Sequence, residues 1–150
     1  MTVVSVWTAT LAAAFVSGFV PVVNIEAYIL GAAALLPGCP PAVVVVPAAL
    51  GQMAAKGLLF LGGRGLVSLP SGFRERAAAV AARIGARRRS APALVFSSAL
   101  TGLPPFYVVS VAAGMLGFRP GRFLLAGFAG RLLRFGAVFA LPGLLAWVVS

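Results

Sequence analysis

The 150-residue sequence has no histidine, one cysteine and only two acidic residues. A Ser-His-Asp triad, a pair of catalytic carboxylates and a zinc site all need residues from this missing set. We therefore expect no metal, no organic cofactor and no enzymatic activity. The single cysteine, Cys39, cannot form a disulfide within the chain. Metal-free transport or lipid handling fits this inventory better than catalysis.

Charge is scarce along most of the chain. Only 9% of the residues are charged, whereas 61% are hydrophobic and the mean hydropathy is +1.08. The first 55 residues carry one charge, Glu26, and residues 90–118 and 135–150 carry none. Soluble domains are about 25% charged, and a membrane helix needs about 20 apolar residues. The composition therefore predicts an all-α integral membrane protein.

The basic residues are concentrated in one stretch between two apolar regions. Residues 74–89 contain one acid, Glu75, and the arginines Arg74, Arg76, Arg83, Arg87, Arg88 and Arg89. Such a cluster marks a cytoplasmic loop first and a site for anionic lipid head groups second. We expect no nucleic-acid partner despite the net charge of +10. The first residues carry no basic side chain, so no cleavable signal peptide is expected.

Both apolar regions are interrupted by residues that end helices. Residues 2–20 stop at Pro21, and the apolar pattern resumes at Ala27 and ends near Leu36. As a helix, this second limb would be about 15 Å long, half of what a span requires. A short limb after a polar break predicts a re-entrant hairpin. The alternative is that residues 2–20 span the membrane alone, with the N-terminus inside.

The second apolar region, residues 91–118, has the same organisation. Its break is formed by Gly102, Pro104 and Pro105, and again it leaves two short limbs. Each hairpin is followed by a segment long enough to cross a bilayer, over residues 42–62 and 123–149. A basic turn over residues 119–122 precedes the second of these segments.

The two halves form a repeat within one membrane domain, residues 1–150. Repeat one covers about residues 8–66, and repeat two covers 91–148. A shift of 81 residues pairs Phe15 with Phe96, and a shift of 79 pairs Gly51 with Gly130. If each half is one hairpin plus one crossing, the second half starts on the opposite side of the membrane. The repeats are then inverted, which places a binding site at the midplane.

The connector, residues 70–90, contains an amphipathic pattern. We predict a helix over residues 72–89 that begins after a capping hydroxyl at Ser71. Its apolar face consists of Phe73, Ala77, Val80 and Ile84, and its flank carries Arg76, Arg83 and Arg87. This pattern favours a helix lying on the cytoplasmic leaflet. The alternative is a solvated basic linker.

Three charged residues at predicted membrane depth are the main functional candidates. Glu26 is the only acid outside the basic stretch, and an intramembrane carboxylate is a candidate for ion pairing or proton exchange. Arg131 and Arg134 share a helix face, and two guanidiniums with one carboxylate leave net positive charge that suits phosphate. We expect Glu26 to reach Arg131, Arg134 or Lys56. The alternatives are that Glu26 is structural or interfacial and that both arginines reach the cytoplasmic surface.

Other candidates are polar or small. Gln52 and Lys56 share a face of the first spanning segment, and Lys56 has the alternative of reaching the surface with its ammonium. Asn24 belongs to the first break and Tyr107 follows the second, and irregular backbone at such breaks must be buried in protein or line a cavity. Close packing of helices is expected at Gly51, Gly57, Gly114, Gly127 and Gly130.

Four motifs together resemble the DedA superfamily, also called the SNARE-associated or VTT-domain family, and are most similar to its small YqaA-like branch. They are FVPVVNIE at residues 19–26, residues 51–64, GLPPFYVVSVAAG at residues 102–114, and GRLLRF at residues 130–135. The resemblance covers about residues 15–140. It implies two re-entrant hairpins meeting from opposite faces of a bacterial cytoplasmic membrane. It also implies movement of phospholipids or polyprenyl phosphates between leaflets, coupled to protons in bacterial members.

On this resemblance, Glu26 matches the acidic residue of the first hairpin and Pro104 matches the proline of the second. The familiar bacterial pattern has arginines three residues to each side of that proline, whereas this sequence has Thr101 and Tyr107. Arg131 and Arg134 are candidates to replace them from the neighbouring helix.

Two functions follow from these expectations. The first is a lipid transporter or scramblase, with lipid head groups as partners and protons and a second copy of the chain as further candidates. The second is a membrane scaffold with structural helix breaks and a lipid-binding basic helix.

Overall fold

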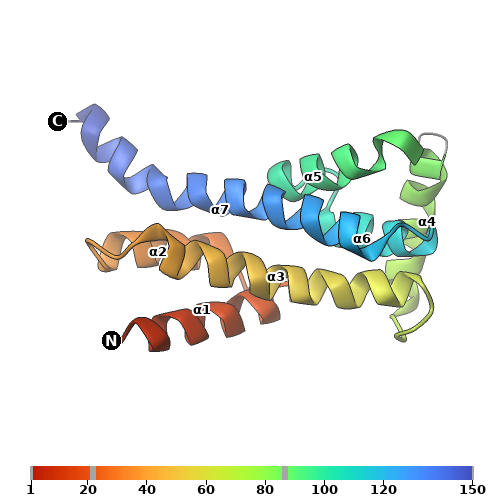
Figure 1. The fold of residues 1–150 in the computed structure, drawn as a ribbon, viewed down its shortest axis with the longest axis horizontal. Coiled ribbons are helices and arrows are strands. Elements are labelled where there is room, and N and C mark those ends of the chain that lie inside the picture. The colour runs from red at the N-terminus through yellow and green to blue at the C-terminus, as the bar shows by residue number, and fades with distance from the viewer. Residues whose placement is uncertain (1, 21–22, 86–87, 150) are drawn as a thin grey trace. The chain divides into compact units, whose positions relative to one another are not determined.

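The computed structural model describes residues 2–20, 23–85 and 88–149, and within these ranges all regular structure is helical. The elements, shown in Figure 1, are α1 (Val3–Ser17), α2 (Ile25–Leu35), α3 (Pro41–Gly63), α4 (Ser71–Gly85), the 3-10 turn η1 (Arg88–Ser90), α5 (Ala91–Thr101), α6 (Phe106–Met115) and α7 (Pro120–Val149). The prediction of an all-α protein is confirmed for the described residues.

Two helices, α3 and α7, are long and apolar enough to cross a membrane. They contain 23 and 30 residues and match the segments predicted at 42–62 and 123–149. The prediction of a basic turn at residues 119–122 is wrong for residues 120–122, because α7 already begins at Pro120. Proline is favoured at the first position of a helix, where its missing N–H costs nothing.

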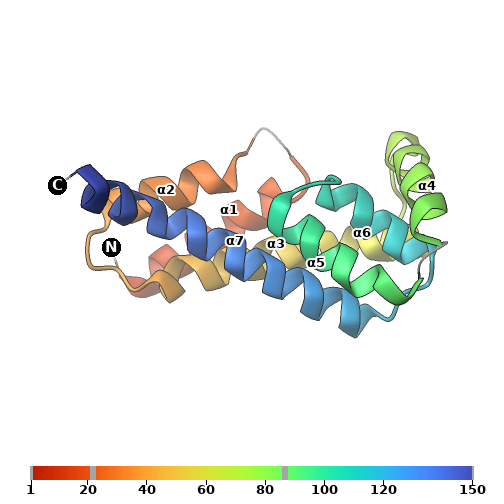
Figure 2. The ribbon, with the colours of Figure 1, turned by 90° about the horizontal axis from the view of Figure 1, so that it is seen from above.

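The helix breaks fall close to the predicted positions. Helix α1 ends at Ser17 and α2 begins at Ile25, while α5 ends at Thr101 and α6 begins at Phe106 (Figure 2). The 15 residues of α1 give a length of about 22 Å, which is short of the roughly 30 Å hydrocarbon core. Residues 2–20 therefore contain a helix that is shorter than a membrane span, as expected for one limb of a hairpin and not for the alternative of a single span. Pro21, predicted as the breaking residue, lies outside the described residues.

The second break is held by side-chain hydroxyls. Gly102 takes the left-handed conformation at φ +80°, which ends α5, and the Leu103–Pro104 peptide bond is cis. The Ser98 hydroxyl donates to the Pro104 carbonyl at 2.6 Å. The Thr101 hydroxyl oxygen accepts from the Leu103 N–H at 3.2 Å. Thr101 thus stabilises the turn.

The chain divides into two compact units. Unit 1 consists of residues 1–52 and 131–150, and unit 2 consists of residues 53–130. Helices α3 and α7 each pass from one unit to the other. Unit 1 therefore contains α1, α2 and parts of α3 and α7, whereas unit 2 contains α4, α5, α6 and the remaining parts.

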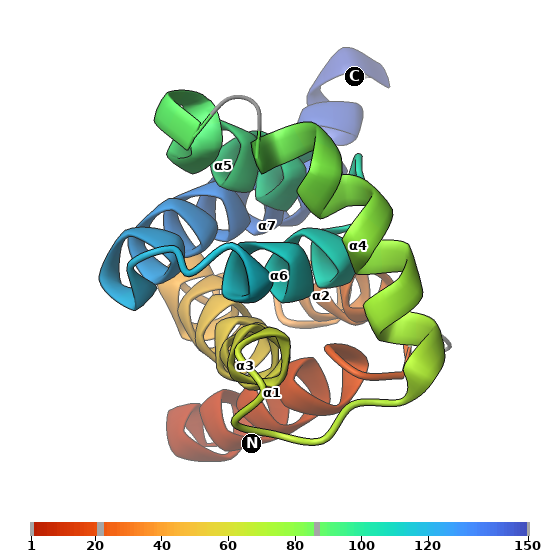
Figure 3. The same ribbon diagram turned by 90° about the vertical axis from the view of Figure 1, so that its right-hand side faces the viewer.

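The core of unit 2 explains the position of α4. Buried Ala77, Ala81 and Ile84 of α4 pack in one cluster with Val108 and Val111 of α6, and Figure 3 shows α4 crossing α6. The predicted apolar face is thus correct, but it is covered by protein. The predicted extent of 72–89 is too long, because α4 ends at Gly85. Arg87 lies outside the described residues.

Glycines allow close helix contacts in both units. In unit 1, a Cβ at Gly51 would collide with α1, at the Leu11 carbonyl, the Ala14 Cβ and the Phe15 N. In unit 2, a Cβ at Gly130 would collide with α5 in the same way, at the Phe96 carbonyl, the Ala99 Cβ and the Leu100 N. Gly114 approaches the Phe60 carbonyl, and Gly127 approaches Met53. Close packing is wrong for Gly57, where a Cβ would meet only Leu124 Cδ2, at 3.9 Å.

Candidate functional site

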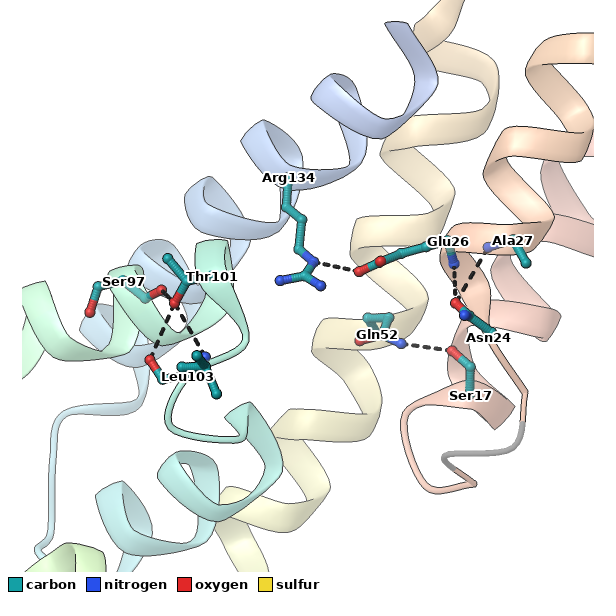
Figure 4. Close-up of polar contacts among 9 residues, drawn as sticks. All are labelled: Ser17, Asn24, Glu26, Ala27, Gln52, Ser97, Thr101, Leu103 and Arg134. Atoms are coloured by element: carbon teal, nitrogen blue, oxygen red, sulfur yellow. Dashed lines mark hydrogen bonds and ion pairs between the residues drawn. The ribbon is translucent and has the colours of Figure 1, made fainter. Parts of the chain in front are cut away.

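An ion pair between Glu26 and Arg134 is the centre of the candidate site in unit 1. The Arg134 Nε–H donates to Glu26 Oε1 at 2.5 Å, and both side chains are half-buried (Figure 4). Glu26 comes from the first turn of α2, where the positive end of the helix dipole favours a carboxylate. The predicted pairing of Glu26 with one of three cations is thus present, and Arg134 is the partner.

Arg131 brings a second guanidinium to the same unit. It lies one helical turn before Arg134 on α7, about 17 Å from the helix start at Pro120. Its residue is only 8% exposed, and its Cζ lies 5.6 Å from the centre of the Phe135 ring, in a cation–π contact. It interacts electrostatically with both Arg134 and Glu26. Because α7 begins at Pro120, Arg131 lies about three turns inside the helix.

Asn24 and Gln52 make further hydrogen bonds in the same unit as the pair. Asn24 caps α2, and its Oδ1 accepts from the N–H groups of Glu26 at 3.0 Å and Ala27 at 3.3 Å. The Gln52 side-chain amide, which is buried in α3, donates to the Ser17 hydroxyl at 2.7 Å. The Asn24 cap shows that Glu26 lies in the helix and not in the break, where the sequence pattern had placed it.

Two predicted site residues belong to unit 2 instead. The Tyr107 hydroxyl accepts from Arg76 Nη1 at 3.1 Å, and its ring packs edge-on against Phe73 at 5.6 Å. Tyr107 therefore joins α6 to α4. Lys56 is buried in the unit 2 part of α3. The structure thus brings together Glu26, Arg131 and Arg134, with Asn24 and Gln52 in supporting contacts.

Sequence reasoning missed three hydroxyl residues of unit 1. Thr10 is fully buried, and its hydroxyl lies 3.0 Å from the Tyr28 hydroxyl, which joins α1 to α2. Ser17 lies two turns after Thr10 on the same face of α1 and accepts from Gln52. Helix α1 also carries Ser5 and Thr8, but only Thr10 and Ser17 are buried. The seven-residue spacing of these two hydroxyls on one helix face is the signal that could have found them.

The charges of this site suit an anionic ligand. One carboxylate and two guanidiniums give a formal net charge of +1, and the carboxylate is bound through a hydrogen bond that another oxyanion could also accept. Arginine binds phosphate well because its planar fork matches the phosphate oxygens. The arrangement therefore combines an arginine hydrogen-bond donor with a net positive charge, and both suit a phosphate.

Comparison with protein-family models, with curated proteins and with solved structures finds no match to this chain.

Proposed function

We propose that this chain is a DedA-like lipid transporter or scramblase of the bacterial cytoplasmic membrane, which moves phospholipid or polyprenyl-phosphate head groups between leaflets. The observation that carries the proposal is the Glu26–Arg134 ion pair, with Arg131 beside it, in a chain that is 61% hydrophobic. Charged groups at membrane depth usually face a bundle interior and mark a substrate or proton pathway.

The distribution of polar and apolar side chains supports a bilayer as the solvent. Leu144 is 58% exposed and Trp147 is 78% exposed on the last turns of α7. In contrast, Gln52 and Arg131 are buried. Exposed apolar helices around buried polar groups suit lipid, and tryptophan is enriched at membrane interfaces. On this proposal α3 and α7 span the membrane, and the hairpins α1–α2 and α5–α6 are re-entrant.

The inverted-repeat architecture is part of the proposal, and the helix bounds support it. Helices α1 and α5 end 84 residues apart, α2 and α6 begin 81 apart, and α3 and α7 begin 79 apart. The first break is three residues longer than the second, which accounts for the change from 84 to 81. Gly51 faces the carbonyl oxygen of Leu11, and Gly130 faces the carbonyl oxygen of Phe96. In the structure, Leu11 is therefore the repeat counterpart of Phe96, whereas the sequence alignment paired Phe15 with Phe96.

In the proposed mechanism, a lipid phosphate competes with Glu26 for the guanidinium of Arg134. Arg131 adds a second positive charge, so the bound phosphate remains neutralised after the carboxylate has left. Protonation of Glu26 favours this exchange, because a neutral carboxyl no longer holds the arginine by charge. Return of the carboxylate releases the lipid. This cycle couples head-group binding to one titratable group and needs no metal.

The scaffold function has a specific observation in its favour. Glu26, Asn24 and Gln52 are each engaged in contacts that also stabilise the hairpin of unit 1. A protein that only shapes the membrane would use the same contacts. It would leave lipids in the leaflet where they start.

Reconstitution into liposomes separates the two functions. The purified full chain is inserted into vesicles that contain a fluorescent phospholipid, and a membrane-impermeant reductant quenches the outer leaflet. A transporter gives loss of fluorescence well beyond the half contributed by the outer leaflet. Fluorescence that stops at the level of protein-free vesicles would refute transport and favour the scaffold.

A further inference from the structure

Unit 2 carries nearly all of the positive charge of the chain. Ten of the twelve basic residues lie within residues 53–130, and the only acid in that range is Glu75. The apolar face of α4 packs against α6, so α4 is anchored on the core of unit 2. The arginines of α4 therefore project from a helix that is packed against the rest of unit 2. Their contacts divide the arginines of the unit into two groups.

Three of these arginines have structural partners. Arg64 donates from Nη2 to the Phe118 carbonyl at 2.5 Å, and Arg74 donates from Nη2 to the Gly62 carbonyl at 3.0 Å. Arg76 donates to Tyr107. The first two satisfy backbone carbonyls near the ends of helices, where such groups lack intrahelical partners. These three side chains hold unit 2 together.

Four others are different. Arg83, Arg89, Arg119 and Arg122 are all exposed, and within the described residues none of their side chains has a hydrogen bond or an ion pair. Glu75 is eight residues before Arg83 on α4, about 12 Å along the helix. The positive charge of this group is therefore not neutralised by that acid.

The fold brings the two segments that carry these arginines to one end of unit 2. A Cβ at Gly85, the last residue of α4, would lie 3.7 Å from Leu116 Cδ2, just after α6. Phe118 packs against the cluster that contains Ile84 and Ala91. Arg83 and Arg89 flank the first segment, and Arg119 and Arg122 follow the second.

Apolar surface begins directly beside this basic group. On α7, Leu124 is 43% exposed and Leu125 is 74% exposed, within one turn of Arg122. A polyanion without an apolar part, such as RNA, would match the arginines but not these leucines. A ligand with an anionic head and a hydrocarbon tail matches both.

We propose that Arg83, Arg89, Arg119 and Arg122 form a peripheral binding site for anionic phospholipids, separate from the Glu26 site of unit 1. The phosphate head groups contact the four guanidiniums, and the acyl chains lie along the exposed leucines of α7. The site keeps anionic lipid at this end of the protein whether or not the protein moves lipids.

Native mass spectrometry of the full chain in detergent tests this proposal. The protein is titrated with phosphatidylglycerol and, separately, with phosphatidylcholine of the same chain length, for wild type and for the paired variants R83Q/R89Q and R119Q/R122Q. Each arginine near an anionic lipid contributes about five-fold in affinity, so each pair should weaken phosphatidylglycerol binding by roughly 25-fold. Phosphatidylcholine binding should change little.

Three results would overturn the proposal. The first is equal binding of phosphatidylglycerol and phosphatidylcholine by the wild-type protein, a result that can be obtained even if the variants do not fold. Both paired variants could fold and bind phosphatidylglycerol as wild type does. A short RNA could displace the lipid at equal concentration, which would make the group a general polyanion surface. Weaker phosphatidylglycerol binding at higher ionic strength supports the proposal, since exposed charges are screened by salt.

Discussion

The Arg134 Nε–H and the Glu26 carboxylate are joined at 2.5 Å, although 108 residues separate them in the chain. The pair connects the start of α2 to the unit 1 part of α7, and so it closes the contact between the first hairpin and the last helix of that unit. Its two members are the only carboxylate of unit 1 and one of its two arginines.

The stability of the pair can be measured by a double-mutant cycle. Glu26→Gln and Arg134→Gln should each lower the free energy of unfolding, because each leaves a partly buried charge without its partner. The double variant should lose less than the sum of the two, with a coupling of about 0.5–3 kcal/mol. Denaturant unfolding in detergent micelles provides the measurement. Strictly additive losses would mean that the two charges do not stabilise each other.

The cap at Asn24 predicts a purely structural effect. Asn24→Ala should lower the free energy of unfolding by about 0.5–2 kcal/mol, since the N–H groups of Glu26 and Ala27 lose their acceptor. Asn24→Asp keeps a capping oxygen and should retain most of the stability. Thermal unfolding followed by circular dichroism compares the variants. Equal losses in both would argue against capping and for a different role of the amide.

Two glycines on different helices allow a matched test of packing. Gly130→Ala places a Cβ 2.7 Å from the Phe96 carbonyl oxygen and should cost about 1–3 kcal/mol in unfolding free energy. Gly57→Ala places it 3.9 Å from Leu124 Cδ2 and should be neutral or stabilising by up to about 1 kcal/mol, because alanine favours a helix. The melting temperatures of the two variants and of wild type, measured in the same detergent, test this difference. A Gly57→Ala loss as large as that of Gly130→Ala would contradict the packing described here.

Much of the fold could be predicted from local signals. Proline and glycine near residues 102–105 end a helix whatever surrounds them, and long uncharged segments can only be long helices in this composition. The break before α2 was placed too late, because the polarity of Glu26 was read as the end of the break. Its capping partner Asn24 shows instead that the helix has already begun.

The site was predictable in its charges but not in its contacts. One acid and few cations at depth leave few possible pairs, so the partner of Glu26 could be limited to three residues. Which of them contacts Glu26 depends on helix packing over 108 residues, and no local pattern encodes that. Tyr107 shows the same limit, since its partner Arg76 comes from a helix that was expected to face lipid.

The proposed topology can be tested with the native cysteine. Cys39 precedes α3 and Leu66 follows it, so the two positions should lie on opposite sides of the membrane if α3 spans it. Impermeant thiol reagents should label Cys39 from one side, and Leu66→Cys in a Cys39→Ser background from the other. Arg122→Cys in that background should be labelled from the same side as position 66. Labelling of positions 39 and 66 from one side would exclude a spanning α3.

The central claim is that the Glu26 carboxylate takes part in lipid movement. The most direct measurement is the leaflet-quenching assay on liposomes that contain wild type, Glu26→Gln or Glu75→Gln, each confirmed as folded and inserted. Glu75→Gln is the matched control, because it removes the only other acid, which lies exposed on α4. We predict that wild type and Glu75→Gln move lipid at similar rates and that Glu26→Gln remains at the level of protein-free vesicles. Lipid movement by Glu26→Gln at the wild-type rate would contradict the proposed site.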